Sequence, residues 1–407
     1  MVKKIFFTGN GCSRRYLDAS RIKSYFEANG CVSVDSPSDA DLIFLTTCSY
    51  KKSKVDECIE NVVKYESYPG EVFVYGCLPG IALERLKGVF HGKYLVTKDL
   101  GRIDEYFPDF KVKIKDIPDA NYVLLEKRGF KELIGTFFSR FKPNMDFFKS
   151  CKNFISRSAL DEDTKNLRIL RIANGCLGKC SYCAIKFSTG YIKSKPLSVC
   201  VDEYKKILEE GCRHIVIDAE DVGAYGADIG SSLDELFTSL SSVDGGYDVV
   251  WSIWTMSPDW AIKYQDVLKN LVSAGKLTRI KVDVQSGSER VLELMNRYPD
   301  LASVKSFFKH VREVNPNVRF HSQFIVGFPS ETEEEFQMTI SFIEEMKFDT
   351  LEISGYSSMN GTPASTLEGQ ISDETIMYRV KYMQNYLRKN GYKTRMQRHY
   401  MSAEKRR

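Results

Sequence analysis

The chain of 407 residues lacks the features that mark membrane and secreted proteins. No run reaches 18 consecutive apolar residues, so the sequence predicts no transmembrane helix. The apolar stretch within residues 1–9 is too short for a signal peptide and predicts a strand instead. Neither sign of charge dominates, because 58 Lys and Arg stand against 54 Asp and Glu. We therefore expect a cytoplasmic chain that does not associate with membranes.

Metal-binding motifs of the zinc type are also absent. Zinc sites usually combine two Cys-x2-Cys pairs or add histidine ligands, and neither pattern stands here at the required spacing. Eleven cysteines are present, an odd number at scattered positions, which favours metal ligation over disulfides in a cytosolic chain. The hydrophobic content of 43% is enough for well-packed cores, and the length predicts two or three domains.

Three of the cysteines are bunched on one predicted loop. Cys176, Cys180 and Cys183 form the pattern Cys-x3-Cys-x2-Cys in the segment GCLGKCSYC. Three thiolates so close can hold three irons of a four-iron cluster and leave the fourth iron open to chelate a small molecule. In radical chemistry that molecule is S-adenosylmethionine, from which one electron releases a 5′-deoxyadenosyl radical. Buried structural cysteines are the weaker interpretation of this spacing.

The first hundred residues predict a small α/β domain with a second cysteine triad. Its expected strands, separated by helices at 16–29 and 54–65, cover 4–8, 41–46 and 71–75. Cys12, Cys48 and Cys77 each follow one of these strands. The carboxyl ends of parallel strands meet at one edge of a sheet, so we expect a second three-cysteine cluster site there. The other cysteines are interpreted as core or surface thiols: Cys31, Cys58, Cys151, Cys200 and Cys212.

Residues 101–165 mix aromatic and cationic side chains. The members of this mixture are Phe130, Phe137, Phe138, Phe141, Phe147, Phe148, Lys127, Arg128, Lys131, Arg140, Lys142, Lys149 and Lys152. Interleaved aromatics and cations can bind a nucleic acid strand. The preferred interpretation is a basic amphipathic helix pair packed on the enzyme.

From residue 166 to about 370 the chain alternates strand and helix. The expected strands are 167–172, 214–217, 249–254, 280–284, 320–326 and 350–354. Six such units predict a partial (β/α) barrel with its catalytic loops at the carboxyl ends of the strands. Residues 371–407 are expected to form a C-terminal helix and a basic tail. Residues 387–407 hold eight Lys or Arg and one Glu, so this tail could contact phosphate, an acidic peptide or only water.

These motifs resemble the radical S-adenosylmethionine methylthiotransferases over nearly the whole chain. Besides the two cysteine triads, five later motifs match in order: Val284–Ser288, Met295–Arg297, Ile325–Pro329, Glu331–Glu333 and Gly361–Pro363. The segment 221–230 is especially similar to the branch that modifies threonylcarbamoyl-adenosine beside the tRNA anticodon. The resemblance implies an N-terminal three-layer α/β methylthiotransferase domain (1–100), an insertion or linker (101–165), a partial (β/α)6 radical barrel (166–370), and a C-terminal part (371–407) without the family's TRAM domain.

The resemblance also implies roles for individual residues. Cys176, Cys180 and Cys183 would hold the radical-generating [4Fe-4S] cluster, and Cys12, Cys48 and Cys77 an auxiliary [4Fe-4S] cluster that takes part in sulfur insertion. The residues implied to contact S-adenosylmethionine are Tyr182 and the backbone of Val326 and Gly327 near the adenine, Glu220 and Asp221 at the methionine amino group, and Gln285 and Ser286 at the ribose and methionine end. For Gln285 and Gly327, a structural role in turn formation and barrel packing is an alternative of equal weight to cofactor binding.

Several positions depart from the family pattern. Ser252 stands where the third barrel strand usually has Arg, Asp283 where a Pro is usual, and Gln323 where an Asp is usual. The usual Tyr-x-Arg-Pro-Gly-Thr-Pro is replaced by the sequence of 356–363. These changes bear on the substrate rather than on the radical chemistry.

The expected function is insertion of a methylthio group into an unactivated C–H bond. The resemblance implies that one S-adenosylmethionine methylates sulfur on the auxiliary cluster and that a second supplies the radical which abstracts hydrogen from a closely held carbon. We expect the substrate to be a peptide or protein side chain, as in peptide maturation. The alternatives are tRNA bearing threonylcarbamoyl-adenosine, sulfur insertion without methylation, and a non-enzymatic iron–sulfur scaffold. The expected partner is a one-electron donor such as flavodoxin or ferredoxin. We expect the chain itself to be a monomer.

Overall fold

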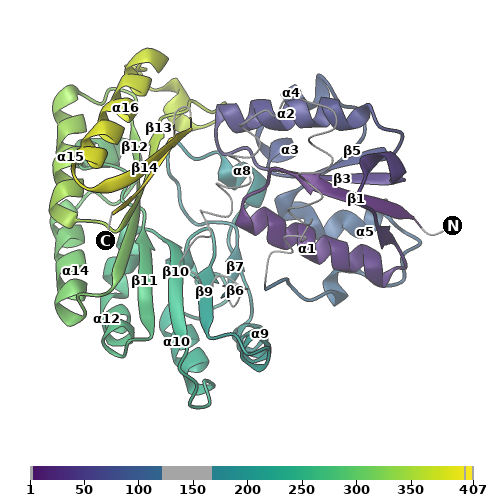
Figure 1. Ribbon diagram of the computed structural model, residues 1–407, viewed down its shortest axis with the longest axis horizontal. Coiled ribbons are helices and arrows are strands. Elements are labelled where there is room, and N and C mark those ends of the chain that lie inside the picture. Colours follow the sequence, from purple (N-terminus) through teal and green to yellow (C-terminus); the bar gives the residue numbers. More distant parts are fainter. Residues whose placement is uncertain (1–2, 122–166, 398–399, 406–407) are drawn as a thin grey trace.

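The computed structural model describes residues 3–121, 167–397 and 400–405, which form two α/β units joined side by side (Figure 1). The first unit is built on a five-stranded sheet and the second on an eight-stranded sheet. Among the described residues, no helix has the length and apolar character needed to cross a membrane.

The N-terminal sheet is parallel, in the order β2-β1-β3-β4-β5. Its strands are β1 (Lys4–Gly9), β2 (Val32–Ser33), β3 (Leu42–Thr47), β4 (Glu71–Gly76) and β5 (Lys93–Val96). The central strand β3 is buried along its whole length, because helices cover both faces of the sheet. The predicted order of strands and helices is therefore confirmed.

Two apolar layers flank this sheet and complete the expected three-layer domain. On one face α1 (Ser13–Ala28) contributes Ile22 and Phe26, which pack with Phe44 of β3. On the other face α2 (Lys52–Glu66) contributes Val55 and Val62. Three short helices also belong to this unit: α3 (Leu78–Ile81), α4 (Leu83–Lys87) and α5 (Ile103–Tyr106).

The segment after residue 100 starts as part of the N-terminal core. Phe107, Phe110, Ile114 and Ile117 pack against the α1 face of the sheet, so the packing of this unit continues to about residue 117. The aromatic and basic residues expected to form a helix pair, 127–152, lie outside the described residues.

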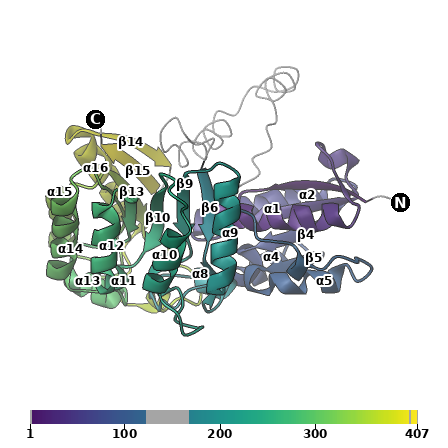
Figure 2. The ribbon, with the colours of Figure 1, turned by 90° about the horizontal axis from the view of Figure 1, so that it is seen from below.

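The second unit contains the six parallel strands expected for a partial barrel. They stand in the order β13-β12-β11-β10-β9-β6 and comprise β6 (Leu167–Arg171), β9 (His214–Asp218), β10 (Val250–Met256), β11 (Leu277–Val282), β12 (Arg319–Val326) and β13 (Thr350–Gly355). Figure 2 shows the outer helices in a row along one side of these strands: α9 (Leu197–Glu209), α10 (Leu233–Ser242), α12 (Gln265–Ser273), α14 (Leu301–Val314) and α15 (Glu333–Met346). Smaller helices fill the connections: α8 (Ile185–Thr189), α11 (Pro258–Lys263) and α13 (Glu289–Leu294).

Alternation along the strands separates an apolar outer layer from a polar interior. On β11, Ile280 and Val282 belong to the core shared with the helices. Successive side chains of a strand point to opposite faces, so Arg279, Lys281 and the following Asp283 face the inside of the barrel. The interior therefore carries charged side chains along β11.

The C-terminal segment is not a tail, and this part of the sequence prediction is wrong. After α16 (Asp373–Lys389), strands β14 (Tyr392–Gln397) and β15 (Tyr400–Lys405) form an antiparallel pair, and β15 pairs with β13. The free edge of β13 offers unpaired backbone groups, and the hairpin satisfies them. The density of Lys and Arg concealed this pairing, because backbone hydrogen bonds do not depend on side-chain charge.

Candidate functional site

The structure brings the three N-terminal cysteines together at the carboxyl edge of the sheet. Cys12 is the N-cap of α1, Cys48 follows β3 directly, and Cys77 follows β4 directly. The Cys48 side chain is within hydrogen-bonding reach of both Cys12 and Cys77. Cys12 is exposed, whereas Cys48 and Cys77 are buried. The geometry expected from the strand ends is therefore present.

A glycine lets the strands that carry two of these cysteines approach closely. Gly76, the last residue of β4, has φ of +118°. A Cβ at this position would lie 2.4 Å from the Thr47 carbonyl oxygen at the end of β3. Because only glycine fits so near a backbone oxygen in this conformation, Gly76 holds Cys77 beside Cys48.

Local electrostatics favour thiolates at two of the three positions. The hydrogen bond from Cys48, aided by the charges of Arg15 and Arg14, lowers the pKa of Cys12 to about 5. The same donor lowers the pKa of Cys77, and the pKa of Cys48 is raised well above its usual value. Since thiolate is the form that binds metals, the triad has the chemistry of a ligand set.

The barrel cysteines lie on a tight loop after β6 and the short strand β7 (Ala173–Asn174). The Cys176 N–H donates to the Gly190 carbonyl at 3.2 Å, and the Gly178 N–H donates to the Cys176 sulfur at 3.1 Å. Arg297 places its Nη1 3.7 Å from the Cys180 sulfur. Burial raises the pKa of Cys176 to about 12 and also raises that of Cys183, whereas a bound metal cation favours the thiolate form.

Both triads fit a four-iron cluster by their donor type. Among the described residues, no three His, Cys, Asp or Glu side chains converge where one metal ion could sit. A four-iron cluster presents its irons at separate corners, so its thiolate ligands surround a space rather than meet at a point. The remaining described cysteines, expected to be core or surface thiols, are all buried in the cores: Cys31, Cys58, Cys200 and Cys212. Cys151 lies outside the described residues.

Backbone hydrogen bonds tie the barrel cysteine loop to motifs far along the chain. The Ser181 N–H donates to the Met295 carbonyl at 2.9 Å, and the Ala364 N–H donates to the Ser181 carbonyl at 2.9 Å. The neighbouring Tyr182 packs against an apolar cluster that includes Phe328 and Tyr356. Motifs that were separate in the sequence therefore meet around this loop.

The two carboxylates after β9 face different partners. Asp221 is buried and accepts hydrogen bonds from the Ser257 N–H at 3.1 Å and the Ser257 hydroxyl at 2.6 Å. Burial raises the pKa of Asp221 to about 6. Glu220 turns toward the N-terminal domain, where its Oε1 lies 3.6 Å from Nη2 of Arg15. Its other oxygen, Oε2, is buried without a hydrogen-bond partner.

Gln285 and Ser286 point in different directions. Gln285 has φ of +81°, is 5% exposed, and leaves its Oε1 buried without a partner. A strained non-glycine residue of this kind is typical of functional sites. Ser286 instead accepts from the Ser288 N–H and lies 3.4 Å from the Thr339 hydroxyl of α15. Its side chain is therefore engaged on the helix side of the sheet.

Val326 and Gly327 end β12 with their backbone already engaged. The Val326 carbonyl accepts from the Tyr356 N–H at 2.8 Å, and the Gly327 N–H donates to Glu331 Oε2 at 2.6 Å. Gly327 has φ of +77°, as the turn alternative requires. Glu331 is held in turn by Arg379 of α16 at 2.6 Å.

The polar interior of the barrel was mostly missed in the sequence. Lys281 lies 3.0 Å from Glu352 Oε2 and 3.7 Å from Asp283 Oδ1. His321, on the intervening strand β12, has its Nε2 buried without a partner. Asp283 was noted only as a departure from the family pattern. The signal that reveals the others is the alternation of charged and apolar residues along β11 and β13.

Two other departures lie on β10 and β12, the strands on either side of β11. Ser252 on β10 is fully buried, with its hydroxyl 2.9 Å from His214 Nε2 on β9. Gln323 on β12 accepts, through its carbonyl, the backbone N–H of Gln285 at 2.9 Å. Neither position therefore reproduces the charge that the family pattern usually has there.

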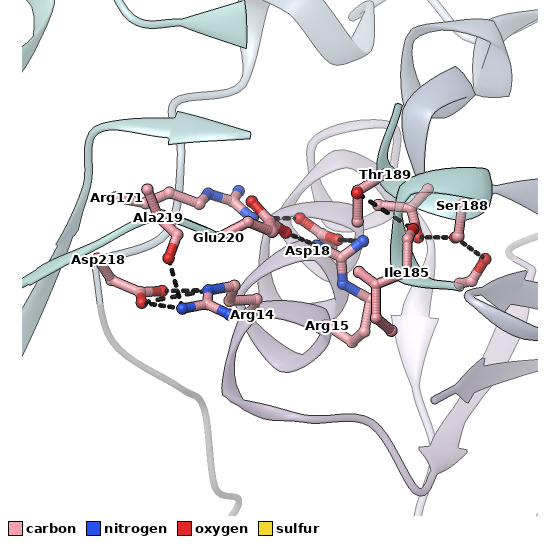
Figure 3. A network of polar contacts seen from close by, with 12 residues as sticks. Arg14, Arg15, Asp18, Arg171, Ile185, Ser188, Thr189, Asp218, Ala219 and Glu220 are labelled. Atoms are coloured by element: carbon pink, nitrogen blue, oxygen red, sulfur yellow. Dashed lines mark hydrogen bonds and ion pairs between the residues drawn. The ribbon is translucent and has the colours of Figure 1, made fainter. Parts of the chain in front are cut away.

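Helix α1, which begins at the N-cap Cys12, contacts the barrel through its first turn (Figure 3). Arg14 donates to both carboxylate oxygens of Asp218 at 2.7–3.1 Å, and also to the Thr255 hydroxyl at 3.0 Å. The Ser188 hydroxyl of α8, close behind the barrel triad, donates to the Gly76 carbonyl at 3.1 Å. The two cysteine sites thus belong to one continuous region of the molecule.

Two family profiles match this chain. Residues 170–343 match the Radical SAM superfamily, and residues 4–97 match the uncharacterized protein family UPF0004. Their ranges contain the barrel triad and the N-terminal triad, respectively. Solved structures share the fold: the radical S-adenosylmethionine methyltransferase TsrM from Kitasatospora setae aligns with a TM-score of 0.59 at 13% identity, over 90% of this chain and 74% of that one.

Curated relatives match across both units. A tRNA-2-methylthio-N(6)-dimethylallyladenosine synthase from Thermosipho africanus is 28% identical over 89% of this chain and 77% of its own. A ribosomal protein uS12 methylthiotransferase RimO from Geotalea uraniireducens is 28% identical over 93% and 80%, and a probable threonylcarbamoyladenosine tRNA methylthiotransferase from Pyrococcus horikoshii is 26% identical over 94% and 85%. The chain belongs to the radical S-adenosylmethionine methylthiotransferases, enzymes that use S-adenosylmethionine and [4Fe-4S] clusters to transfer sulfur.

Proposed function

We propose that this enzyme inserts a methylthio group into an unactivated C–H bond of a macromolecular substrate presented to the barrel interior. The observation that carries the proposal is the juxtaposition of two three-cysteine sets, one at the sheet edge of the N-terminal unit and one on the barrel loop, joined by direct contacts of α1 and α8. When bound, a cluster on Cys176, Cys180 and Cys183 would supply the electron that cleaves S-adenosylmethionine. A cluster on the N-terminal triad would supply iron that holds the sulfur to be transferred.

The chain's own residues bind and orient around these sites. Asp221, whose charge acts on Cys176 of the barrel loop, and the adjacent Glu220, whose Oε2 has no partner, are carboxylates suited to the amino group of the cofactor's methionine end. Arg297 steadies the loop through its contacts with the Cys180 sulfur and the Asp283 carbonyl. Tyr182 contributes an apolar surface suited to an adenine ring. These contacts fix where a radical would form, which decides which carbon it meets.

The finer proposal is that the target carbon belongs to a peptide or protein side chain. Proteins that act on a flipped base usually hold it by stacking on aromatic rings and reading its polar edge. The interior positions described on β11 and β13 instead include Lys281, Asp283 and Glu352, whose charges lie close together. Such an interior suits a polar side chain, and the uS12 enzyme from Geotalea uraniireducens is named for a protein substrate.

A tRNA nucleoside is the second candidate. Relatives named for tRNA substrates are as similar to this chain as the uS12 enzyme is. In that case binding should weaken steeply with added salt, because phosphate contacts release counterions.

Mass spectrometry after anaerobic reconstitution with iron, sulfide, reductant and S-adenosylmethionine tests the proposal. Bulk tRNA and a small-peptide extract of the host are offered separately. We expect a peptide to gain one methylthio group in place of hydrogen, and a gain on a nucleoside alone would replace the peptide proposal with the tRNA candidate. Cys48→Ala should abolish the gain, whereas Cys31→Ala, a buried thiol of the same unit, should retain it. Cofactor cleavage with no sulfur gain on either pool would overturn the proposal.

A further inference from the structure

Arg15 lies between the N-terminal cysteine triad and the barrel. It sits in the first turn of α1, three residues after Cys12, and is only 1% exposed. Its charge acts on both Cys12 and Cys77, which places the guanidinium close to the triad. On its other side is Glu220, from the loop that follows β9.

The guanidinium of Arg15 has donors to spare. Nη1 lies 3.3 Å from Asp18 Oδ2 and Nη2 lies 3.6 Å from Glu220 Oε1, yet neither nitrogen makes a hydrogen bond. Asp18 is already shared, because it accepts from Tyr75 at 2.8 Å and from Arg171 at 2.5 Å. A buried charged group with unmade hydrogen bonds is costly, so these N–H groups need an acceptor.

The acceptor that the surroundings point to is sulfur. We propose that Arg15 donates its unpaired N–H groups to the sulfur atoms of the auxiliary cluster and thereby raises that cluster's reduction potential, with Glu220 as the opposing charge. Hydrogen bonds to cluster sulfurs and nearby positive charge stabilise the reduced, more negative state. Arg15 is a positioning residue that acts through the cluster, so this inference rests on the auxiliary cluster of the proposed function.

A redox titration of the auxiliary cluster alone tests this role. The chain carrying Cys176→Ala, Cys180→Ala and Cys183→Ala is reconstituted with iron and sulfide, and the cluster's midpoint potential is followed by electron paramagnetic resonance. Arg15→Gln should shift the midpoint to more negative values, because a cation and two donors are lost. Glu220→Gln should shift it to more positive values, because the opposing anion is lost. Arg21→Gln, on the same helix but bonded to carbonyls at 114 and 117, should leave it unchanged.

Opposite shifts separate this role from simple structural support, which would move both variants the same way. Equal midpoints for Arg15→Gln and Arg21→Gln, or shifts of one sign in Arg15→Gln and Glu220→Gln, would overturn the inference. If Arg15→Gln fails to bind iron, Arg15→Lys takes its place, because lysine keeps the charge, and it should show a smaller negative shift of the midpoint potential. In that case a wild-type midpoint in Arg15→Lys, together with no positive shift in Glu220→Gln, would overturn the inference. If the chain that carries only the three barrel Cys→Ala changes shows no cluster signal, that result would instead overturn the auxiliary cluster itself.

Discussion

At the scale of single residues, the barrel interior depends on groups whose charge state is set by burial. His321 lies on β12 between Lys281 of β11 and Glu352 of β13, and desolvation together with the Lys281 charge lowers its pKa to about 3. The imidazole is therefore neutral at physiological pH. A neutral ring beside a Lys–Glu pair lets the interior stay polar without adding a further positive charge.

This depressed pKa predicts a specific loss of stability in acid. Below the unfolded value of about 6.5 the unfolded chain takes up a proton at His321 that the native chain refuses until about pH 3. Stability is therefore fully present above about pH 6.5 and falls as pH decreases toward 3, by roughly 1 kcal/mol per pH unit from this group. The free energy of unfolding, measured in urea, should therefore differ less between pH 7 and pH 5 in His321→Gln than in the wild type, by the share that His321 contributes. The control is His310→Gln, an exposed histidine of α14; an equal change in both variants would contradict the assignment.

Single residues also mark where sequence reasoning reached its limit. Cys12, Cys48 and Cys77 could be placed together because each follows a strand of one parallel sheet. The orientation of the Glu220 side chain could not be predicted, since it depends on a contact with Arg15 of the other domain. Ser286 was expected near the cofactor, but its partner Thr339 lies 53 residues further along, a contact that local pattern does not encode.

At the scale of elements, the end of β12 is fixed to α16 by one buried ion pair. Glu331 accepts from the Gly327 N–H and from Arg379, both at 2.6 Å, and its side chain has no exposed surface. This arrangement orders the turn that follows the strand. It also attaches the helix preceding the C-terminal hairpin to the barrel mouth.

Breaking that pair should destabilise the barrel strongly. Glu331→Gln leaves the buried Arg379 with only the more distant, exposed Glu333 as a charge partner, and the loss of one member of a buried ion pair typically costs about 3 to 5 kcal/mol. Urea unfolding at neutral pH measures the loss. Glu333→Gln is the matched control, because Glu333 is 3.6 Å from the same arginine but its side chain is 56% exposed; we expect a change below about 1 kcal/mol. Equal losses in the two variants would show that burial of the pair is not what holds α16.

Elements were predictable where apolar periodicity was strong. The buried strand β3 and the six barrel strands stand within a few residues of their expected positions, because their outer faces are continuous with the helix core. The hairpin β14–β15 was not predicted, since its pairing depends on the open edge of β13 and its sequence is rich in charge. Phe107 and Phe110 likewise joined the N-terminal core through contacts beyond the expected boundary.

At the scale of the whole molecule, two domains with separate cysteine triads act as one unit. Arg14 crosses from α1 to Asp218 and Thr255 of the barrel, and Ser188 of α8 reaches back to Gly76. Both triads stand close to these crossing points. The arrangement suits a reaction in which one site generates a radical and the other provides sulfur to the same substrate carbon.

The measurement that tests this account most directly is 5′-deoxyadenosine formation from S-adenosylmethionine in two triple variants of the reduced, reconstituted protein. With Cys176, Cys180 and Cys183 changed to Ala, we predict loss of deoxyadenosine. With Cys12, Cys48 and Cys77 changed to Ala, we predict that deoxyadenosine still forms while bound iron falls to about half and sulfur transfer stops. Formation at the wild-type rate in the first variant, or unchanged iron in the second, would contradict the assignment of two cluster sites.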